Sequence, residues 1–169
     1  MSAQGPVVLV GLPGAGKSKV GRLLAERLGV DHIDTDALVV EREGRPIADI
    51  FATDGEAAFR VMETAAVAHA LTGHAVISLG GGAAATPAVR DLLDGHTVVY
   101  IDAPHDELVR RTAGKTHRPP LAADPARAPR RLRAEREPHY RAVATVTVPT
   151  GPGPVDDVVT DILNHLEHQ

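Results

Sequence analysis

The sequence predicts an α/β fold, a doubly wound five-stranded parallel sheet flanked by helices, formed by a single domain over residues 1–169. Three observations lead to this prediction. Short, almost uninterrupted apolar runs alternate with stretches of helical periodicity, as in parallel sheets that are buried on both faces. A glycine-rich turn follows the first apolar run directly. The length of the chain is that of one ordinary domain.

Five segments have the composition of strands. The first, Val7–Val10, is entirely aliphatic, and the second, Asp31–Ile33, is short. The other three are Ala75–Leu79, Thr97–Ile101 and Thr145–Val148. In a sheet of this class, ligands bind beyond the carboxyl ends of the strands.

Helices are expected between the strands, at Lys17–Leu28, from the segment Thr53–Glu56 through about Leu71, from Pro87 onward, and at Val155–Leu166. Gly29 is a natural residue to follow a helix C-terminus. Thr53 and Glu56 have the spacing of a capping box, which predicts a helix start there. Thr86 before Pro87 indicates an N-cap followed by a proline in the first helical position.

The composition narrows the function classes. The formal net charge is −4 and only 2% of residues are aromatic, which argues against nucleic-acid or membrane binding. No apolar run approaches the ~20 residues of a membrane span, and residues 1–6 lack the features of a signal peptide. The absence of cysteine excludes disulfides and cysteine nucleophiles and suits the cytosol. We therefore expect a cytoplasmic monomer that acts on small molecules, with no nucleic-acid or membrane partner.

The segment Gly11–Ser18, with the sequence GLPGAGKS, lies between the first predicted strand and the first predicted helix. Its spacing, G-x-x-x-x-G-K-[ST], and its context are those of a phosphate-binding P-loop. The glycines let backbone N–H groups turn toward a polyphosphate, and the following helix points its positive end at the same anions. Lys17 can reach the β- and γ-phosphates, and the Ser18 hydroxyl can bind Mg²⁺.

Three further segments suit chemistry. Asp34 and Asp36 follow the second strand, so one can hold Mg²⁺ through water while the other accepts a proton from a substrate hydroxyl. An Asx turn that caps the next helix is the equal alternative. Gly80–Gly82 indicates close approach of the backbone to a ligand, with a loose loop as the alternative. The polar, Pro/Gly-rich segment 112–124 is typical of a mobile lid that expels water during phosphoryl transfer.

Taken in order, these segments resemble the shikimate kinase family, which belongs to the nucleoside-monophosphate-kinase-like P-loop group. The similarity extends from Val7 to about Leu166. It rests on GLPGAGKS at 11–18, DTD at 34–36, IADIFATDGEAAFR at 47–60, SLGGG at 78–82, Arg118-Pro119 and REPHY at 136–140. The resemblance implies a P-loop NTPase fold with the P-loop strand central. It also implies Mg²⁺- and ATP-dependent phosphorylation of the shikimate 3-hydroxyl, in aromatic amino acid biosynthesis.

The resemblance also implies roles for individual residues. Nucleotide binding falls to Gly14, Ala15, Gly16, Lys17, Ser18, Lys19, Arg111 and Arg118. Ser18 would bind Mg²⁺ directly, with Asp34 behind it. Substrate binding falls to Asp36, Arg60, Gly80, Gly81, Gly82 and Arg136, on a lobe of helices at about 34–72 and the segments facing it. Lys17, Asp36 and Arg118 would be catalytic, with Asp36 as base, and Glu63 would orient Arg60. Phe51 and Phe59 would wall the sugar-like ring.

Two rival functions remain at this point. Gluconate kinase or another small-metabolite P-loop kinase could use the same arginine pair for a different carboxylate. A catalytically silent nucleotide-binding module is the rival from another class, although such a module need not keep Lys17, Asp36 and Arg118.

Overall fold

The structure is a computed structural model that describes the backbone of residues 5–112 and 127–168 and the side chains of residues 5–110 and 130–168. The side chain of Arg111, Arg118 with its chain neighbours, and all but the first residue of the expected lid at 112–124 therefore lie outside the described residues.

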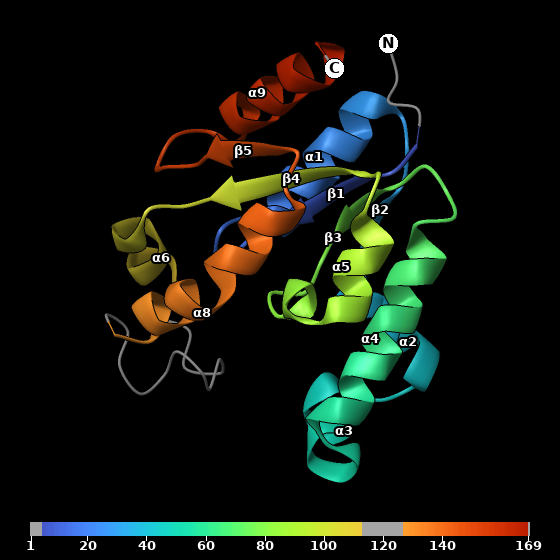
Figure 1. Cartoon of the computed structure of the whole chain (residues 1–169). Coiled ribbons are helices and arrows are strands. Elements are labelled where there is room, and N and C mark those ends of the chain that lie inside the picture. The colour runs from blue at the N-terminus through green and yellow to red at the C-terminus, as the bar shows by residue number, and fades with distance from the viewer. Residues whose placement is uncertain (1–4, 113–126, 169) are drawn as a thin grey trace.

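A five-stranded sheet forms the centre of the molecule, in the order β2-β3-β1-β4-β5, and every neighbouring pair of strands is parallel (Figure 1). The strands are β1 (Val7–Val10), β2 (His32–Asp34), β3 (Val76–Ser78), β4 (Thr97–Asp102) and β5 (Val146–Pro149). The predicted fold class and the central place of the P-loop strand are confirmed. Most strand ends lie one residue away from the predicted position, and the remaining ends agree with it.

Helices cover both faces of this sheet (Figure 1). They are α1 (Lys17–Leu28), α2 (Thr35–Glu43), α3 (Ile47–Asp54), α4 (Glu56–Ala70), the short 3₁₀ turn η1 (Ala83–Ala85), α5 (Pro87–Leu93), α6 (His105–Thr112), α8 (Arg127–Val143) and α9 (Val155–Glu167). Helices α1 and α9 pack against each other on one face, while α5 and α8 lie over the other. None of the helices within the described ranges is long and apolar enough to cross a membrane.

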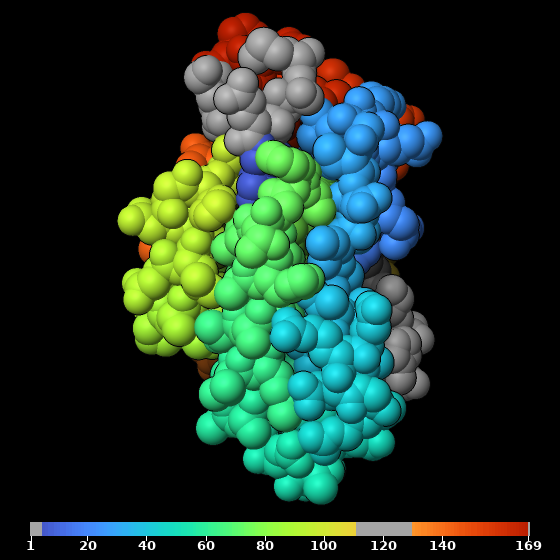
Figure 2. All heavy atoms as spheres, turned by 90° about the vertical axis from the view of Figure 1, so that its right-hand side faces the viewer, coloured from blue at the N-terminus to red at the C-terminus, as the bar shows by residue number. Residues whose placement is uncertain are grey.

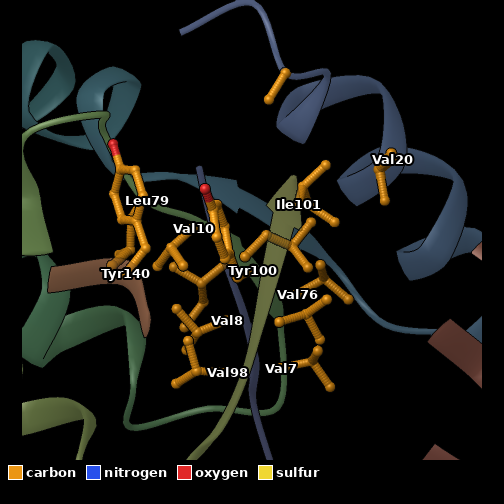
Figure 3. Packing of buried hydrophobic residues seen from close by; sticks show 14 of the residues in the cluster. Val7, Val8, Val10, Val20, Val76, Leu79, Val98, Tyr100, Ile101 and Tyr140 are labelled. Carbon is orange, nitrogen blue, oxygen red and sulfur yellow. The ribbon is translucent and has the colours of Figure 1, made fainter. Parts of the chain in front are cut away.

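The main core forms around β1, where no residue is more than 1% exposed. Figure 3 shows Val7, Val8 and Val10 packed among side chains of the neighbouring strands, with Tyr140 of α8 beside Tyr100 of β4. The two tyrosine rings lie 5.3 Å apart between centroids. Burial on both faces explains why the strand is an unbroken aliphatic run.

Helices α2, α3 and α4 carry a second, separate core made of Val39, Ile50, Phe59 and Ala66. Figure 2 shows these helices gathered at the lower end of the molecule. This group, residues 35–70, is called the α2–α4 lobe below. Its separate core lets the lobe keep its own shape beside the sheet.

The capping box predicted at Thr53 is wrong. Thr53 lies in the last turn of α3, where its hydroxyl donates to the Asp49 carbonyl oxygen. Gly55, with φ +88°, separates α3 from α4, which begins at Glu56. The prediction failed because a threonine inside a helix bonds to the preceding turn with the same hydroxyl that would otherwise cap. Pro87 is the first residue of α5 as predicted, but Thr86 makes no side-chain cap bond.

Candidate active site

A cleft of about 1040 Å³ lies at the carboxyl ends of the strands, where the fold predicts a ligand site. The P-loop, the start of α2, the α2–α4 lobe, the glycine segment after β3, α8 and the loop before α9 all contribute to its walls. The predicted site residues that line it are Gly14, Ala15, Gly16, Lys17, Ser18, Lys19, Asp34, Asp36, Arg60, Gly81, Gly82 and Arg136. Segments far apart in the sequence thus meet in one cavity.

The P-loop joins β1 to α1 through three glycines with positive φ, at Gly11, Gly14 and Gly16. A methyl group at Gly11 would lie 2.6 Å from the carbonyl oxygen of Ile101, so the loop can only pass β4 without a side chain there. Lys17, in the first turn of α1, donates from Nζ to the Gly11 carbonyl oxygen at 2.6 Å. Its ammonium group is therefore held at the mouth of the loop, beside the positive end of the helix.

Asp34 and Asp36 divide two tasks that the sequence left open. Asp34 Oδ1 accepts from the backbone N–H groups of Asp36 at 2.9 Å and Ala37 at 3.2 Å, which caps α2. Asp34 Oδ2 accepts from the Ser18 hydroxyl at 3.2 Å. The capping alternative is thus confirmed for Asp34 Oδ1, and the role of Asp34 toward Mg²⁺ stays a prediction.

Asp36 faces the interior of the cleft. Burial, and then the neighbouring Asp34 charge, raise the pKa of the Asp36 carboxyl above its usual range, and Lys17 and Arg60 partly offset this rise. A carboxylate with a raised pKa accepts a proton more readily than an ordinary one. Asp36 is therefore suited to act as a base for a bound hydroxyl group.

The glycine segment after β3 makes room for side chains of the site. A methyl group would lie 2.5 Å from Asp36 Oδ1 if placed on Gly80, and 2.6 Å from Arg60 Nη2 if placed on Gly82. On Gly81 it would lie 3.0 Å from Arg136 Nη1. Real Cβ atoms almost never approach within 3.0 Å of another heavy atom. Each glycine therefore accommodates a different polar side chain, a role that the sequence did not reveal.

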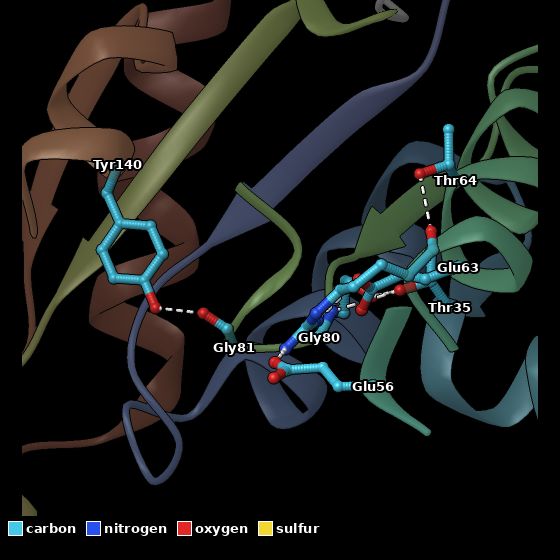
Figure 4. A network of polar contacts seen from close by, with 9 residues as sticks. Thr35, Glu56, Glu63, Thr64, Gly80, Gly81 and Tyr140 are labelled. Carbon is cyan, nitrogen blue, oxygen red and sulfur yellow. Dashed lines mark hydrogen bonds and ion pairs between the residues drawn. The ribbon is translucent and has the colours of Figure 1, made fainter. Parts of the chain in front are cut away.

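Arg60, which is half-buried, forms an ion pair with the buried Glu63 on α4. Arg60 Nη1 donates to Glu63 Oε1 at 2.7 Å, and Arg60 Nη2 lies 3.3 Å from Glu56 Oε2. The Glu63 side chain is 1% exposed, and this burial raises the pKa of its carboxyl, while the bond to Arg60 acts in the opposite direction. The predicted contact between Glu63 and Arg60 is present, and Figure 4 shows Glu63 and Glu56 beside Gly80.

Aromatic rings border the Arg60 side of the cleft. Phe51 and Phe59 both line it, with ring centroids 4.8 Å apart, and the Arg60 guanidinium lies 5.2 Å from the centroid of Phe59. These rings supply an apolar wall beside the charged groups, as predicted for a ring-shaped ligand.

Tyr140 is a site residue that the sequence reasoning missed. Its hydroxyl donates to the Gly81 carbonyl oxygen, from the opposite side of the glycine segment to Glu63 (Figure 4). The side chain is 1% exposed, and burial raises the pKa of Tyr140 to about 12. Tyr140 lies one turn after Arg136 on α8, so this contact fixes α8 against the glycine segment. Only the REPHY motif pointed to this region.

The far end of the cleft is formed by Arg110 of α6, Leu132 of α8 and the loop Thr150–Gly153. Arg110 pairs with Glu107, one turn earlier on α6. This part of the lining mixes apolar and polar side chains, as is usual in sites for small molecules.

Comparisons with known proteins agree with this geometry. A family model described as "Shikimate kinase" matches residues 13–167. The shikimate kinase of Mycobacterium avium is 54% identical over 161 residues, which cover 94% of this chain and 92% of the relative. The shikimate kinase of Mycobacterium tuberculosis is 54% identical over 162 residues, which cover 95% and 92%.

Solved structures are similar over the same length. The shikimate kinase from Acinetobacter baumannii in complex with shikimate has a TM-score of 0.91 and 35% identity, with 97% of this chain and 93% of that chain covered. A gluconokinase from Sinorhizobium meliloti has a TM-score of 0.67 at 22% identity, covering 99% of this chain and 94% of that one, and shares the fold.

Proposed function

The chain belongs to the shikimate kinase family, and we propose that its cleft transfers the γ-phosphoryl group of ATP to the 3-hydroxyl of shikimate. The products are shikimate 3-phosphate and ADP, in the route to chorismate and the aromatic amino acids. One observation carries the proposal: a single cleft is lined by the P-loop, Asp36, Arg60 and Arg136, and the Asp36 carboxyl is close enough to both Lys17 and Arg60 for their charges to lower its pKa.

The acceptor end of the cleft suits a carboxylated, hydroxylated ring. Arg60 and Arg136 hold the carboxylate of shikimate, because planar guanidinium groups pair well with carboxylates. Phe51 and Phe59 cover the ring, and backbone groups of Gly80–Gly82 bind its hydroxyl groups. In this proposal the α2–α4 lobe provides Asp36, Arg60 and both phenylalanines to the acceptor site, and α8 provides Arg136.

The nucleotide end suits a Mg²⁺–polyphosphate. Residues Gly14–Lys19 hold the phosphates through backbone N–H groups and the Lys17 ammonium. Ser18 and Asp34 would hold Mg²⁺, Ser18 directly and Asp34 behind it. Their hydroxyl and carboxylate oxygens are the donor type that this ion prefers. When bound, Mg²⁺ neutralises part of the phosphate charge.

The proton and the phosphoryl charge are handled by separate residues. The oxygen of the 3-hydroxyl attacks the γ-phosphorus in line while Asp36 accepts the hydroxyl proton. The bond between the γ-phosphorus and the oxygen that bridges it to the β-phosphate breaks, which releases ADP. Lys17 stabilises the negative charge on the transferring group. By resemblance, Arg118 assists there from the lid at 112–124 and Arg111 stacks on adenine. Their side chains lie outside the described residues.

Apart from Gly80, the described residues named for acceptor binding line one cleft within a single copy of the chain. We therefore propose that the single domain works as a monomer. We place it in the cytoplasm, with which its lack of cysteine agrees. Size-exclusion chromatography with light scattering, and fractionation of the source cells, test these two points.

A coupled assay for ADP release tests the reaction with ATP and Mg²⁺ present. Shikimate, gluconate and no acceptor are compared at equal concentration, and ³¹P NMR identifies the phosphorylated position. The proposal predicts that, of these three conditions, only shikimate supports turnover, and that the product is shikimate 3-phosphate. Turnover with gluconate would indicate the rival metabolite kinase, and nucleotide binding without any turnover would indicate a silent module.

A further inference from the structure

A chain of hydrogen bonds behind the P-loop connects β2, β3 and α1. His32 Nε2 lies 2.9 Å from the Ser78 hydroxyl oxygen, and that hydroxyl lies 3.1 Å from the backbone carbonyl oxygen of Lys17. His32 is half-buried and is not among the groups used by the reaction described above. Ser78 directly precedes Leu79 and the glycine segment.

The direction of these bonds follows from their chemistry. A backbone carbonyl can only accept, so the single hydroxyl hydrogen of Ser78 is donated to Lys17. The Ser78 oxygen then acts as acceptor for His32, and His32 Nε2 must carry a hydrogen. Each bond therefore fixes the orientation of the next, and the chain of bonds ends on the first residue of α1.

Close packing makes this arrangement intolerant of displacement. Gly21, one turn after Lys17 on α1, faces both partners: a methyl group there would lie 2.6 Å from His32 Nε2 and 2.8 Å from Ser78 Oγ. Helix α1 can therefore lie this close to β2 and β3 only because position 21 has no side chain. The histidine and the serine occupy the space that this approach leaves.

We propose that His32 is a positioning residue for the P-loop helix. Its Nε2–H group holds the Ser78 hydroxyl toward the Lys17 carbonyl, and this fixes the first turn of α1, with the Lys17 and Ser18 side chains, against the strand ends. The inference rests on the proposed function and adds to it a residue outside the cleft that tunes the nucleotide half of the site.

The acceptor half is held by a different contact. The Thr35 hydroxyl accepts from the Gly80 N–H at 3.1 Å, which ties the start of α2 to the glycine segment without His32. Arg60 is held by Glu63 and Glu56 on its own helix. Loss of the His32 bond should therefore weaken nucleotide binding and turnover and leave shikimate binding in place.

The test compares two amides at position 32 in the full chain. In His32→Gln the amide nitrogen takes nearly the position of Nε2 and can still donate to Ser78. In His32→Asn the amide is too short to reach it. Ser78→Ala removes the middle of the chain of bonds, and His74→Asn, at an exposed histidine before β3, is the matched control. The dissociation constant of Mg²⁺–ADP, kcat, both KM values and thermal unfolding are measured for each variant.

We expect His32→Asn and Ser78→Ala each to weaken Mg²⁺–ADP binding and lower kcat by about three- to tenfold, the range of one hydrogen bond. His32→Gln and His74→Asn should stay within about twofold of the unmodified chain, and KM for shikimate should change little in any variant. When combined with Ser78→Ala, His32→Gln and His32→Asn should no longer differ from each other in Mg²⁺–ADP affinity or in kcat.

Equal behaviour of Gln and Asn at position 32 would overturn the proposal, as would wild-type nucleotide affinity in Ser78→Ala, which only removes one atom and should fold. A parallel rise in KM for shikimate would show general loosening instead of positioning. Mg²⁺–ADP binding is measured without an acceptor, so the outcome stands even if the unmodified chain fails to phosphorylate shikimate. Such a failure would refute the proposed function alone.

Discussion

Asp34 and Asp36 are only two residues apart, yet their surroundings give them different chemistry. Both oxygens of Asp34 are occupied, one by the N-terminus of α2 and the other by the Ser18 hydroxyl. Asp36 lies against Gly80 and faces the positive charges of Lys17 and Arg60. Asp34 therefore holds the start of α2 against Ser18 of the P-loop helix, while the proposed role of Asp36 is to accept a proton from the acceptor.

The substitution Asp36→Asn tests this division. It keeps the shape of the side chain but removes its ability to take a proton, so kcat should fall by about 100-fold or more. Isothermal titration should find Mg²⁺–ATP affinity within about twofold of the unmodified chain. Asp91→Asn, at an exposed carboxylate on α5, is the control. A collapse of nucleotide affinity equal to the loss of kcat would assign Asp36 to the metal site instead.

Substitution of either Arg60 or Arg136 by lysine tests the carboxylate site. Lysine keeps the charge but lacks the planar fork, so KM for shikimate should rise about tenfold while KM for ATP hardly moves. A shikimate analogue without the carboxylate should bind the unmodified chain poorly and lose little more in the variants. If shikimate and the analogue lost equal affinity, the arginines would not pair with the carboxylate.

At the scale of elements, the segment Gly80–Gly82 shapes the site because it has no side chains, which leaves room for those of neighbouring elements. The three residues do not have the positive φ that would itself require glycine, so their small size is what matters. The segment sits between the α2–α4 lobe, which brings Asp36 and Arg60, and α8, which brings Arg136 and Tyr140. Helices α2, α4 and α8 can therefore each place a charged side chain against this one short loop.

Alanine substitutions in this segment should separate its contacts. Gly82→Ala would push Arg60 aside, and because an arginine tip is flexible, the protein should fold and show a raised KM for shikimate. Gly80→Ala would press on Asp36 and should mainly lower kcat. Steady-state kinetics with thermal unfolding as control checks both. An identical pattern in the two variants would mean that the segment acts as one unit.

The elements that local signals define were predicted well. Helix α1 has its predicted bounds, because the P-loop fixes its start and Gly29 its end. The separate helices α2 and α3 were not predicted, because each has only about two turns, too few for a clear helical periodicity. The contacts of Tyr140, His32 and Ser78 could not be predicted, because they join segments that meet only in the folded chain. Of the site residues carried over from the family motifs, those with described side chains all line one cleft except Gly80.

At the scale of the whole molecule, the fold separates two tasks. The sheet with α1 carries the P-loop and draws its rigidity from the main core. The α2–α4 lobe has its own core of Val39, Ile50, Phe59 and Ala66 and carries Arg60. The reaction requires both parts to face the same volume, with Asp36 where they meet. The central claim is that one cleft orders nucleotide and acceptor in line.

A crystal structure of the chain with shikimate and Mg²⁺–ADP bound tests that claim most directly. The predicted result has the shikimate carboxylate paired with Arg60 and Arg136 and its 3-hydroxyl hydrogen-bonded to Asp36. The ADP phosphates should lie in the loop Gly14–Ser18, with the β-phosphate directed toward that hydroxyl. A carboxylate bound elsewhere, or a 3-hydroxyl turned away from Asp36 and the β-phosphate, would contradict it.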